Sequence, residues 1–272
     1  MNVRLVDSMG SDAAIVQAAR VSYGAGTKSV SDDRALIRYL MRHKHTTPFE
    51  MVEFKFHIRA PIYVARQWLR HRTASVNEMS ARYSIVDTGF FLPEEFRKQS
   101  TSRGQGGEEP YGEGSPNLLA KQKAACDLAF HVYDELIANG VSRELARALL
   151  PQNTFTEFYW KIDLHNLLHF LQLRMDDHAQ KEIRDLARQI YELIKPICPV
   201  TCEAFEDFRV GSMTLSRLEI DAIKNGNSKI PGKGENQEFK EKLDILHIEP
   251  EIVPPPRPKS FFGRILTCFS KA

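Results

Sequence analysis

The chain has 272 residues, of which 42% are hydrophobic, 26% charged and 10% aromatic. This composition is typical of a globular protein and excludes collagen-like, disordered and disulfide-dense classes for the bulk of the chain. The 37 Lys and Arg residues nearly balance the 35 Asp and Glu residues, so net charge gives no reason to expect a nucleic acid polymer or a membrane as partner.

The four cysteines, Cys126, Cys198, Cys202 and Cys268, are too few for a disulfide framework in a chain of this length. Cys198 and Cys202 have no second Cys/His pair nearby that would complete a zinc site. We therefore expect reduced thiols, a cytoplasmic location and no metal. No apolar segment near the N-terminus predicts a secretory signal, and no run of 18 apolar residues predicts a membrane span.

The first part of the chain predicts three helices and a strand. Alanine-rich residues 11–23 favour a short helix, and Ser31 or Asp32 is the expected N-cap of a second. Residues 51–59 alternate between apolar and polar side chains, which predicts a half-buried strand. Pro61 then opens a third helix at a position where proline is tolerated.

Two loops are expected next. Residues 73–89 are irregular, and residues 99–117 are rich in Gly, Ser, Pro and charged side chains, which is typical of a mobile surface loop. The spacing of apolar residues predicts a helix over 118–139 that ends at Gly140. Ser142 is the expected N-cap of a short helix after it.

Residues 154–162 are aromatic and β-branched, which predicts a second strand. Asp163 is the expected N-cap of the following helix, and another helix is expected over 179–195. Together these elements predict an α+β subunit in which helices flank a small mixed or antiparallel sheet.

After residue 217 the composition changes to Lys, Asn, Gly, Pro and Glu. We expect one domain over residues 1–217 and a low-complexity, flexible C-terminal tail over 218–272. The short basic and apolar stretch 260–272 is compatible with contact to a membrane surface or a partner, but a loosely packed end is the interpretation we favour.

Basic and imidazole side chains are concentrated between Gln67 and Tyr83. Gln67, Arg70 and His71 share the spacing of one helical face, and arginine binds phosphate through two parallel hydrogen bonds. On physical grounds alone, a solvated basic face and a noncatalytic nucleotide- or single-strand-binding module are competing interpretations.

The string RHRTASVNEMSARY over residues 70–83 matches the pattern RHRxxSxNExSxRY at all nine fixed positions, and this pattern is the signature of flavin-dependent thymidylate synthases. The resemblance covers roughly residues 1–217. Other stretches that resemble this family are AARVSY at 18–23, HTTPFE at 45–50, APIYVARQW at 60–68, ARALLPQNTFTEFYW at 146–160 and LRMDDHAQKEIR at 173–184.

The resemblance implies conversion of dUMP to dTMP. Methylene-tetrahydrofolate would supply the carbon, reduced FAD the hydride, and NADPH would reduce the flavin. It also implies a homotetramer in which each active site is built from several subunits. A protein of this fold that uses another pyrimidine nucleotide, or makes another one-carbon product, is the alternative.

The resemblance further implies which residues form the site. Residues expected to bind dUMP are Gln67, Arg70, Glu78, Ser80, Arg82, Arg147 and Arg174. Residues expected to contact FAD are Ser22, Thr47, Arg70, His71, Arg72 and Glu78, together with Asp163, His165 and His169 from another subunit.

Arg174 is the expected catalytic residue, because a cation beside the pyrimidine would stabilise negative charge that develops on N3 and its flanking carbonyls. No cysteine lies near the signature, which favours a route without a thiol adduct. Ser80 has no evident base beside it in sequence, so we favour a binding role over a nucleophilic one. His165 and His169 have a spacing that could suit a metal, but no third ligand is evident.

Overall fold

The computed structural model describes residues 1–21, 30–100, 107 and 109–247. Ser22, one of the residues expected to contact FAD, lies outside them. The chain divides into two compact units, of which the first is Met1–Gly211 and the second begins at Ser212.

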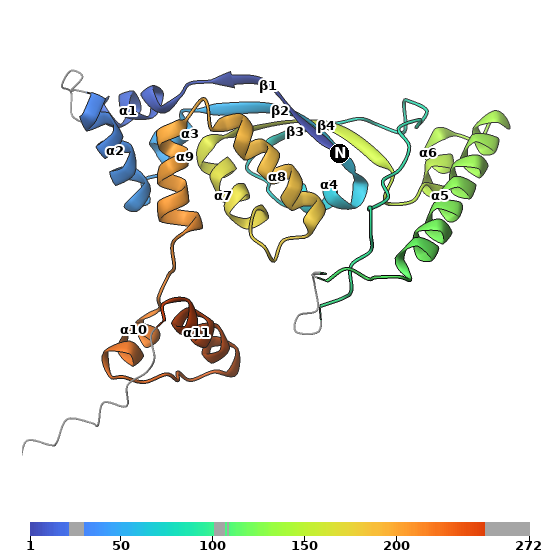
Figure 1. Ribbon diagram of the computed structural model, residues 1–272. Coiled ribbons are helices and arrows are strands. Elements are labelled where there is room, and N and C mark those ends of the chain that lie inside the picture. Colours follow the sequence, from blue (N-terminus) through green and yellow to red (C-terminus); the bar gives the residue numbers. More distant parts are fainter. Residues whose placement is uncertain (22–29, 101–106, 108, 248–272) are drawn as a thin grey trace, which may run out of the picture. The chain divides into compact units, whose positions relative to one another are not determined.

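The first unit is built on a four-stranded antiparallel sheet with strand order β1-β2-β4-β3 (Figure 1). This confirms the predicted α+β class. The strands are β1 (Asn2–Met9), β2 (Glu53–Pro61), β3 (Ser75–Glu78) and β4 (Phe155–Asp163). The two central strands, β2 and β4, are the two that the sequence predicts.

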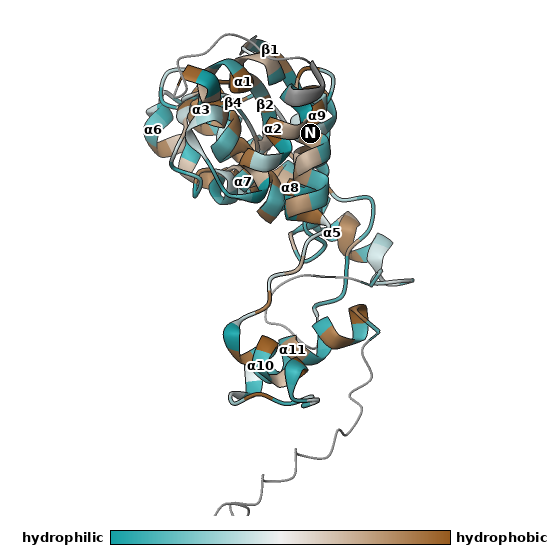
Figure 2. Ribbon diagram, turned by 90° about the vertical axis from the view of Figure 1, so that its left-hand side faces the viewer, coloured by the Kyte–Doolittle hydropathy of each residue, from teal (hydrophilic) through white to brown (hydrophobic). Residues whose placement is uncertain are grey.

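Buried and more exposed side chains alternate along β2 and β4, so one face of the sheet packs against the core. Phe54, Phe56 and Ile58 on β2 are buried, as are Phe158 and Trp160 on β4, because every second residue of a strand points to the same side. The helices that pack near this face are α4 (Ile62–Trp68), α7 (Leu164–Arg174) and α8 (Lys181–Ile194). Figure 2 shows hydrophobic and hydrophilic residues alternating along α8, as expected of a helix with one buried face.

A second group of helices packs at one end of the sheet. It comprises α1 (Asp12–Val21), α2 (Val30–Arg42), α3 (Thr47–Glu50), α9 (Pro199–Phe205) and the π-helical turn η2 (Glu206–Val210). Asp12 joins distant parts of this group, because its carboxylate accepts hydrogen bonds from the backbone N–H of Val200, at 2.8 Å, and from the Thr201 hydroxyl, at 2.6 Å.

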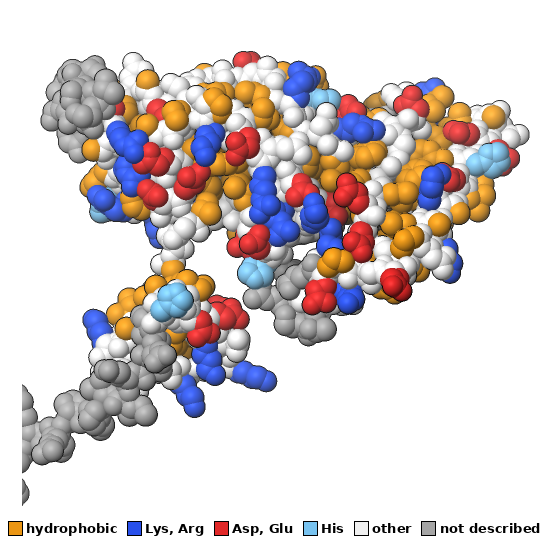
Figure 3. Space-filling view, viewed as in Figure 1, with side chains coloured by type: hydrophobic (Ala, Val, Ile, Leu, Met, Phe, Trp, Pro, Cys, Tyr) orange, Lys and Arg blue, Asp and Glu red, His pale blue; other side chains and the backbone are white. Residues whose placement is uncertain are grey.

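The remaining helices of this unit form a smaller core. They are α5 (Ser115–Ala138), α6 (Arg143–Ala146) and the 3₁₀ turn η1 (Arg147–Leu149). The hydroxyl of buried Tyr133 accepts a hydrogen bond from the Val86 backbone at 3.0 Å. Ser142 is the N-cap of α6, as predicted, but its side chain makes no capping hydrogen bond. Hydrophobic side chains gather over α5 and α6 at the right of Figure 3, and side chains of both charges gather in the middle of the same face.

Two further strands depart from the sequence analysis. β3 lies within residues 73–89, which we expected to be irregular, and all four of its residues are exposed. A strand without a buried face has no alternating pattern by which it could be predicted. β1 was not predicted either, and its register shifts between Leu5 and Asp7, which interrupts its periodicity.

The expectation of a flexible tail from residue 218 is wrong for its first part. The second unit contains α10 (Arg217–Lys224) and α11 (Lys233–Ile245), which pack around buried Phe239. Ser216 and Glu219 form a capping box at the start of α10, and Lys242 of α11 donates to Glu219 at 2.7 Å. The rest of the expected tail, residues 248–272, lies outside the described residues.

None of the helices in the described part of the chain is long and apolar enough to cross a bilayer.

We expect a chain truncated after Gly211 to fold with a thermal unfolding midpoint within about 2 °C of the transition of the first unit in the full chain. The reason is that the hydrophobic residues of the main core, including those packed at its border, extend no further than Phe208, whereas the core of the second unit begins at Ala222. Circular dichroism would measure both midpoints. A midpoint many degrees lower in the truncated chain would contradict the expectation that the first unit is stable without the second.

Candidate active site

The signature segment begins at the end of α4. Pro61 ends β2 and is the N-cap of this helix, one position before the predicted one, and buried Trp68 ends it. Trp68 packs edge-on against Trp160 of β4, with ring centroids 5.2 Å apart, and in a tilted arrangement against Phe170 of α7, with centroids 4.6 Å apart. The expectation that Gln67, Arg70 and His71 share one helical face is therefore wrong, because the helix ends before Arg70.

Arg174 connects the end of α7 to the end of α4. Its Nε donates to Nε2 of His71 at 3.1 Å, and its terminal nitrogen donates to the backbone carbonyl of Gln67 at 3.4 Å. A guanidinium can only donate hydrogen bonds, so Nε2 of His71 carries a lone pair and the ring proton is on Nδ1. The predicted catalytic residue and two predicted ligands thus form one cluster.

His71 is held in its neutral form. Burial, then the positive charge of Arg174, then His169 lower the pKa of His71 from 6.5 to about 4. The ring packs edge-on against Phe170, with centroids 4.9 Å apart. A neutral imidazole beside a partly buried guanidinium leaves the positive charge of Arg174 available to an anionic or electron-rich ligand.

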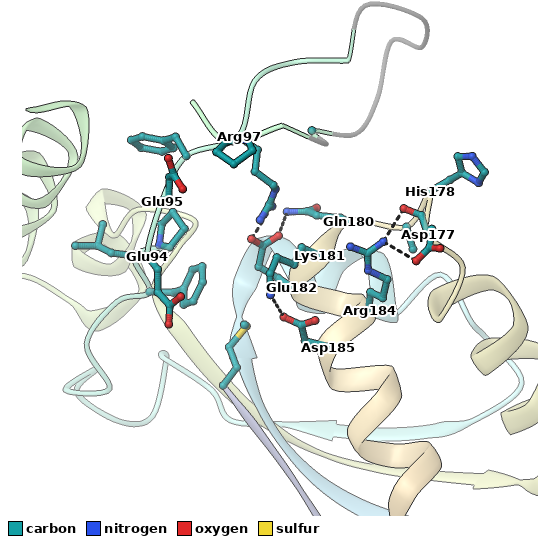
Figure 4. Close-up of a pocket in the computed structure, with 18 residues that line it drawn as sticks. Glu94, Glu95, Arg97, Asp177, His178, Gln180, Lys181, Glu182, Arg184 and Asp185 are labelled. Carbon is teal, nitrogen blue, oxygen red and sulfur yellow. Dashed lines mark hydrogen bonds and ion pairs between the residues drawn. The ribbon is translucent and has the colours of Figure 1, made fainter. Parts of the chain in front are cut away.

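Gln67 and Arg174 line a cavity of about 640 Å³, and an adjoining cavity of about 790 Å³ shares several of its walls. Figure 4 shows the shared wall, where Arg97 reaches across from the segment before α5 to Glu182 on α8. Glu182 accepts from Arg97 at 2.8 Å and from Gln180 at 2.8 Å, and Gln180 in turn accepts from Gln67. The sequence analysis missed Arg97, Gln180 and Glu182 as cavity residues.

His165 and His169 line a smaller cavity of about 100 Å³ with His45 and Thr46. His169 lies beside His71, with ring centroids 6.1 Å apart, so this cavity adjoins the Arg174 cluster. Thr47, at the start of α3, is exposed.

Asp163 has a local structural role. Its carboxylate caps α7 by accepting from the backbone N–H of Asn166 at 2.9 Å, which confirms the predicted N-cap. The side-chain amide of Asn166 donates to its other oxygen at 2.7 Å.

Four other predicted ligands form a second group, which lies apart from this cluster. Glu78 accepts from the hydroxyl of Thr156 at 2.6 Å, and Ser80 accepts from the backbone N–H of Arg82 at 3.3 Å. Arg82 pairs with Glu144 of α6 at 2.7 Å, and exposed Arg147 follows α6 in η1. Within the described residues, no hydrogen bond or ion pair joins Glu78, Ser80, Arg82 or Arg147 to the Arg174 cluster.

Arg70 and Arg72 follow α4 as exposed side chains. Neither they nor Arg147 has an acidic partner in the described part of the chain, so three guanidinium groups remain available to anions. This donor set fits the phosphates of a nucleotide and the pyrophosphate of FAD, because guanidinium groups bind phosphate oxygens in pairs. The described residues contain no group of three His, Cys, Asp or Glu side chains that could hold a metal ion.

We expect an NMR titration of the ligand-free protein to give a pKa of about 4 for His71. Arg174→Ala should raise this pKa toward 6.5, because it removes a neighbouring positive charge and admits water. Arg184→Ala is the matched control, because Arg184 pairs with Asp177 in the wall of the larger cavity, outside the cavity at Arg174, and should leave the pKa of His71 unchanged.

The lowered pKa of His71 also makes the free energy of unfolding depend on pH. Between pH 4 and about 6.5 the unfolded chain binds a proton at His71 that the folded chain does not, so the free energy of unfolding should fall as the pH is lowered through this range. A His71→Asn variant should show a shallower pH dependence of its unfolding midpoint in this range. An identical slope would contradict the low pKa.

Comparison with known proteins connects this geometry to a family. Residues 4–200 match the family model described as thymidylate synthase complementing protein. A flavin-dependent thymidylate synthase of Dictyostelium discoideum is 54% identical over 255 residues, covering 90% of this chain and 84% of the relative. Another, from Thermus thermophilus, is 55% identical over 222 residues and covers 82% of both chains.

A solved structure has a similar fold. The UMP/dUMP methylase PolB from Streptomyces cacaoi, bound with 5-Br dUMP, matches with a TM-score of 0.71 and 36% identity over 76% of this chain and 95% of that chain. Sequence and fold therefore agree over most of the first unit, and the chain belongs to the flavin-dependent thymidylate synthase family.

Proposed function

We propose that this protein converts dUMP to dTMP by reductive methylation, with FAD as bound cofactor, methylene-tetrahydrofolate as carbon donor and NADPH as reductant. The observation that carries the proposal is the position of Arg174 at the wall of a polar cavity, between neutral His71 and Gln67. Membership of the family supports the reaction, and this cluster supplies a physical basis for it.

Arg174 has the properties that the reaction needs. C5 of uracil becomes a nucleophile when the ring carries negative charge on N3 and the flanking carbonyl oxygens, and electron density then moves from the ring into the new bond between C5 and the one-carbon unit. A guanidinium that is already oriented by two acceptors stabilises this charge without reorganisation, and partial burial strengthens the attraction. Because His71 is neutral, it positions Arg174 without competing for the substrate.

The other route to an activated pyrimidine, addition of a thiolate to C6, has no support among the described cysteines. Cys126, Cys198 and Cys202 are all buried. Burial raises the pKa of Cys202 to about 12 and that of Cys198 further, so neither forms a thiolate near neutral pH. None of the three lines the cavity at Arg174.

The residues present fit a flavin. As the resemblance implies, Thr47 would contact the flavin together with His165 and His169 of another subunit, and Arg70 and Arg72 would bind its pyrophosphate. When bound and reduced, flavin supplies the hydride that completes the methyl group. The chain contributes orientation and positive charge, and the buried aromatic cluster behind Trp68 holds these side chains in place.

We also propose a homotetramer with active sites shared between subunits. The support is that the expected dUMP ligands fall into two groups within one chain. Gln67 and Arg174 are joined by a hydrogen bond, and none of the described hydrogen bonds or ion pairs joins Glu78, Ser80, Arg82 or Arg147 to them. A site that combines the first group of one subunit with the second group of another would bring them together around one nucleotide.

We further propose that residues 1–217 carry the activity and that the protein is cytoplasmic. Free Cys126, Cys198 and Cys202 are compatible with a reducing compartment.

The reaction is tested by tritium release from C5-labelled dUMP, with FAD, NADPH and methylene-tetrahydrofolate each omitted in turn. The expected result is release and dTMP formation only in the complete mixture, and a protein without a flavin spectrum or without release would refute the proposal. C5-labelled UMP should be compared in the same assay, because the similar methylase PolB is described as acting on UMP and dUMP.

Arg174→Ala should lower dTMP formation by at least about 100-fold, because it removes the charge that stabilises the electron-rich pyrimidine. Flavin content, measured by absorbance of the purified protein, should stay close to that of the wild type. Turnover at the wild-type rate in a flavin-loaded variant would remove Arg174 from the catalytic role.

Mixed tetramers test the shared site. Arg174→Ala and Arg147→Ala should each be inactive alone, but subunits mixed after reversible dissociation should recover up to about a quarter of wild-type activity, because that fraction of sites receives both intact groups of ligands. Each variant dissociated and reassembled alone is the control. Mixtures as inactive as the separate variants would indicate that both groups act within one chain.

A further inference from the structure

Arg209 is a partly buried arginine near the end of the first unit, outside the signature segment. It belongs to the turn η2, in which the backbone N–H of Gly211 donates to the carbonyl oxygen of Glu206, five residues earlier, at 2.7 Å. Such π-helical turns are rare and occur frequently at functional sites. The side chains of η2 are therefore candidates for a role in binding.

The two residues before Arg209 are held by α2. Arg38 of α2 pairs with Asp207 at 2.7 Å, and the carbon of its guanidinium lies 4.9 Å from the centre of the Phe208 ring. Arg38 also pairs with Glu203 of α9 at 2.6 Å. These contacts fix η2 against α2, while the side chain of Arg209 lines the cavity of about 100 Å³ that residues of α7 also line.

This cavity contains positive charge and no carboxylate. His165 and His169 line it together with Arg209. Among the described residues of its wall, Arg209 is the only lysine or arginine, and none is an aspartate or a glutamate. A ligand with negative charge inside this cavity would therefore meet a cation on the wall and no acidic side chain. The remaining lining residues are either polar and uncharged, like Gln172, or apolar, like Phe205.

The size and the polarity of the cavity limit what it can hold. A volume of about 100 Å³ has room for about three water molecules, so it admits only the edge of a larger ligand. A flavin ring has a dimethylbenzene edge without polar groups and a pyrimidine edge with carbonyl oxygens and ring nitrogens. Imidazole, amide and guanidinium groups match the pyrimidine edge, because they can hydrogen-bond to it.

A cation at this edge would favour one redox state of the flavin. The oxidised ring is neutral. When NADPH transfers a hydride to N5, the ring gains two electrons and one proton, and the resulting negative charge is shared by N1 and the C2 oxygen. A guanidinium beside these atoms therefore binds the reduced ring more tightly than the oxidised ring.

We propose that Arg209 is a cofactor-binding residue that contacts the edge of FAD formed by N1 and the C2 oxygen and stabilises the reduced cofactor. This inference rests on the proposed function and on the expectation that His165 and His169 contact the flavin. The protein would then use two separate arginines for two charges, with Arg174 at the pyrimidine of the substrate and Arg209 at the flavin.

Arg209→Gln tests the inference, because it removes the charge and keeps a hydrogen-bond donor. We expect reduced FAD to bind about tenfold less tightly relative to oxidised FAD, which corresponds to a fall of about 30 mV in the two-electron reduction potential. Spectroelectrochemical titration of the purified holoprotein against a dye of known potential would measure it. Flavin content should stay close to that of the wild type, because the oxidised ring is neutral.

Two variants make the test specific for charge in the cavity. Arg209→Lys keeps the positive charge and should have a potential close to that of the wild type. Arg34→Gln also removes one arginine, but Arg34 lies outside the cavity and pairs with Glu203, which keeps Arg38 as a partner. The potential of this control should equal that of the wild type, and thermal unfolding would report structural effects separately.

A wild-type potential in flavin-loaded Arg209→Gln would overturn the inference. An equal weakening of oxidised and reduced FAD would also overturn it, because this result indicates a contact with the phosphates or a merely structural role. If Arg209→Gln folds poorly, Arg209→Met should show the same fall in potential and replaces it in both comparisons. Wild-type protein that binds no flavin would instead refute the proposed function, so the two failures are distinguishable.

Discussion

The site depends on the contact between the end of α4 and the end of α7. Trp68, Trp160 and Phe170 pack together beneath this point and exclude water from it. This packing partly buries His71 and Arg174, and desolvation is the largest cause of the lowered pKa of both groups. A partly buried guanidinium interacts with a ligand more strongly than one in open solvent. The packing of the hydrophobic core therefore also strengthens the interaction of Arg174 with its ligand.

The predicted site residues include two kinds of cation. Arg174 is held by two acceptors and shielded, whereas Arg70, Arg72 and Arg147 are exposed and have no acidic partner within the described residues. The first kind suits charge that develops during a reaction, because its geometry is already fixed. The second suits phosphate groups, which carry full charge before binding and can order flexible side chains.

Those parts of the fold that depend on a local sequence pattern could be predicted from the sequence. The alternation of residues 51–59 and the capping position of Asp163 depend on neighbours in sequence, and the structure confirms both. β3 and the helices after residue 217 were missed, because an exposed edge strand has no periodicity and α11 buries little more than Phe239 and Leu243. The wider resemblance to the family identified Gln67 and Arg174, but Glu182 was missed as a cavity residue, since its position depends on tertiary contacts with Arg97 and on Gln180.

The two halves of the signature segment, residues 70–83, differ in how firmly the fold holds them. Its first part follows Trp68, which is anchored in the main core, whereas residues 75–78 form a short edge strand with every side chain exposed. Amide hydrogens of β3 should therefore exchange with solvent well before those of β2 and β4, because opening an exposed edge strand disturbs few buried contacts. The half of the motif that includes Glu78 thus lies on the part of the sheet that opens first, and the half that follows α4 remains fixed.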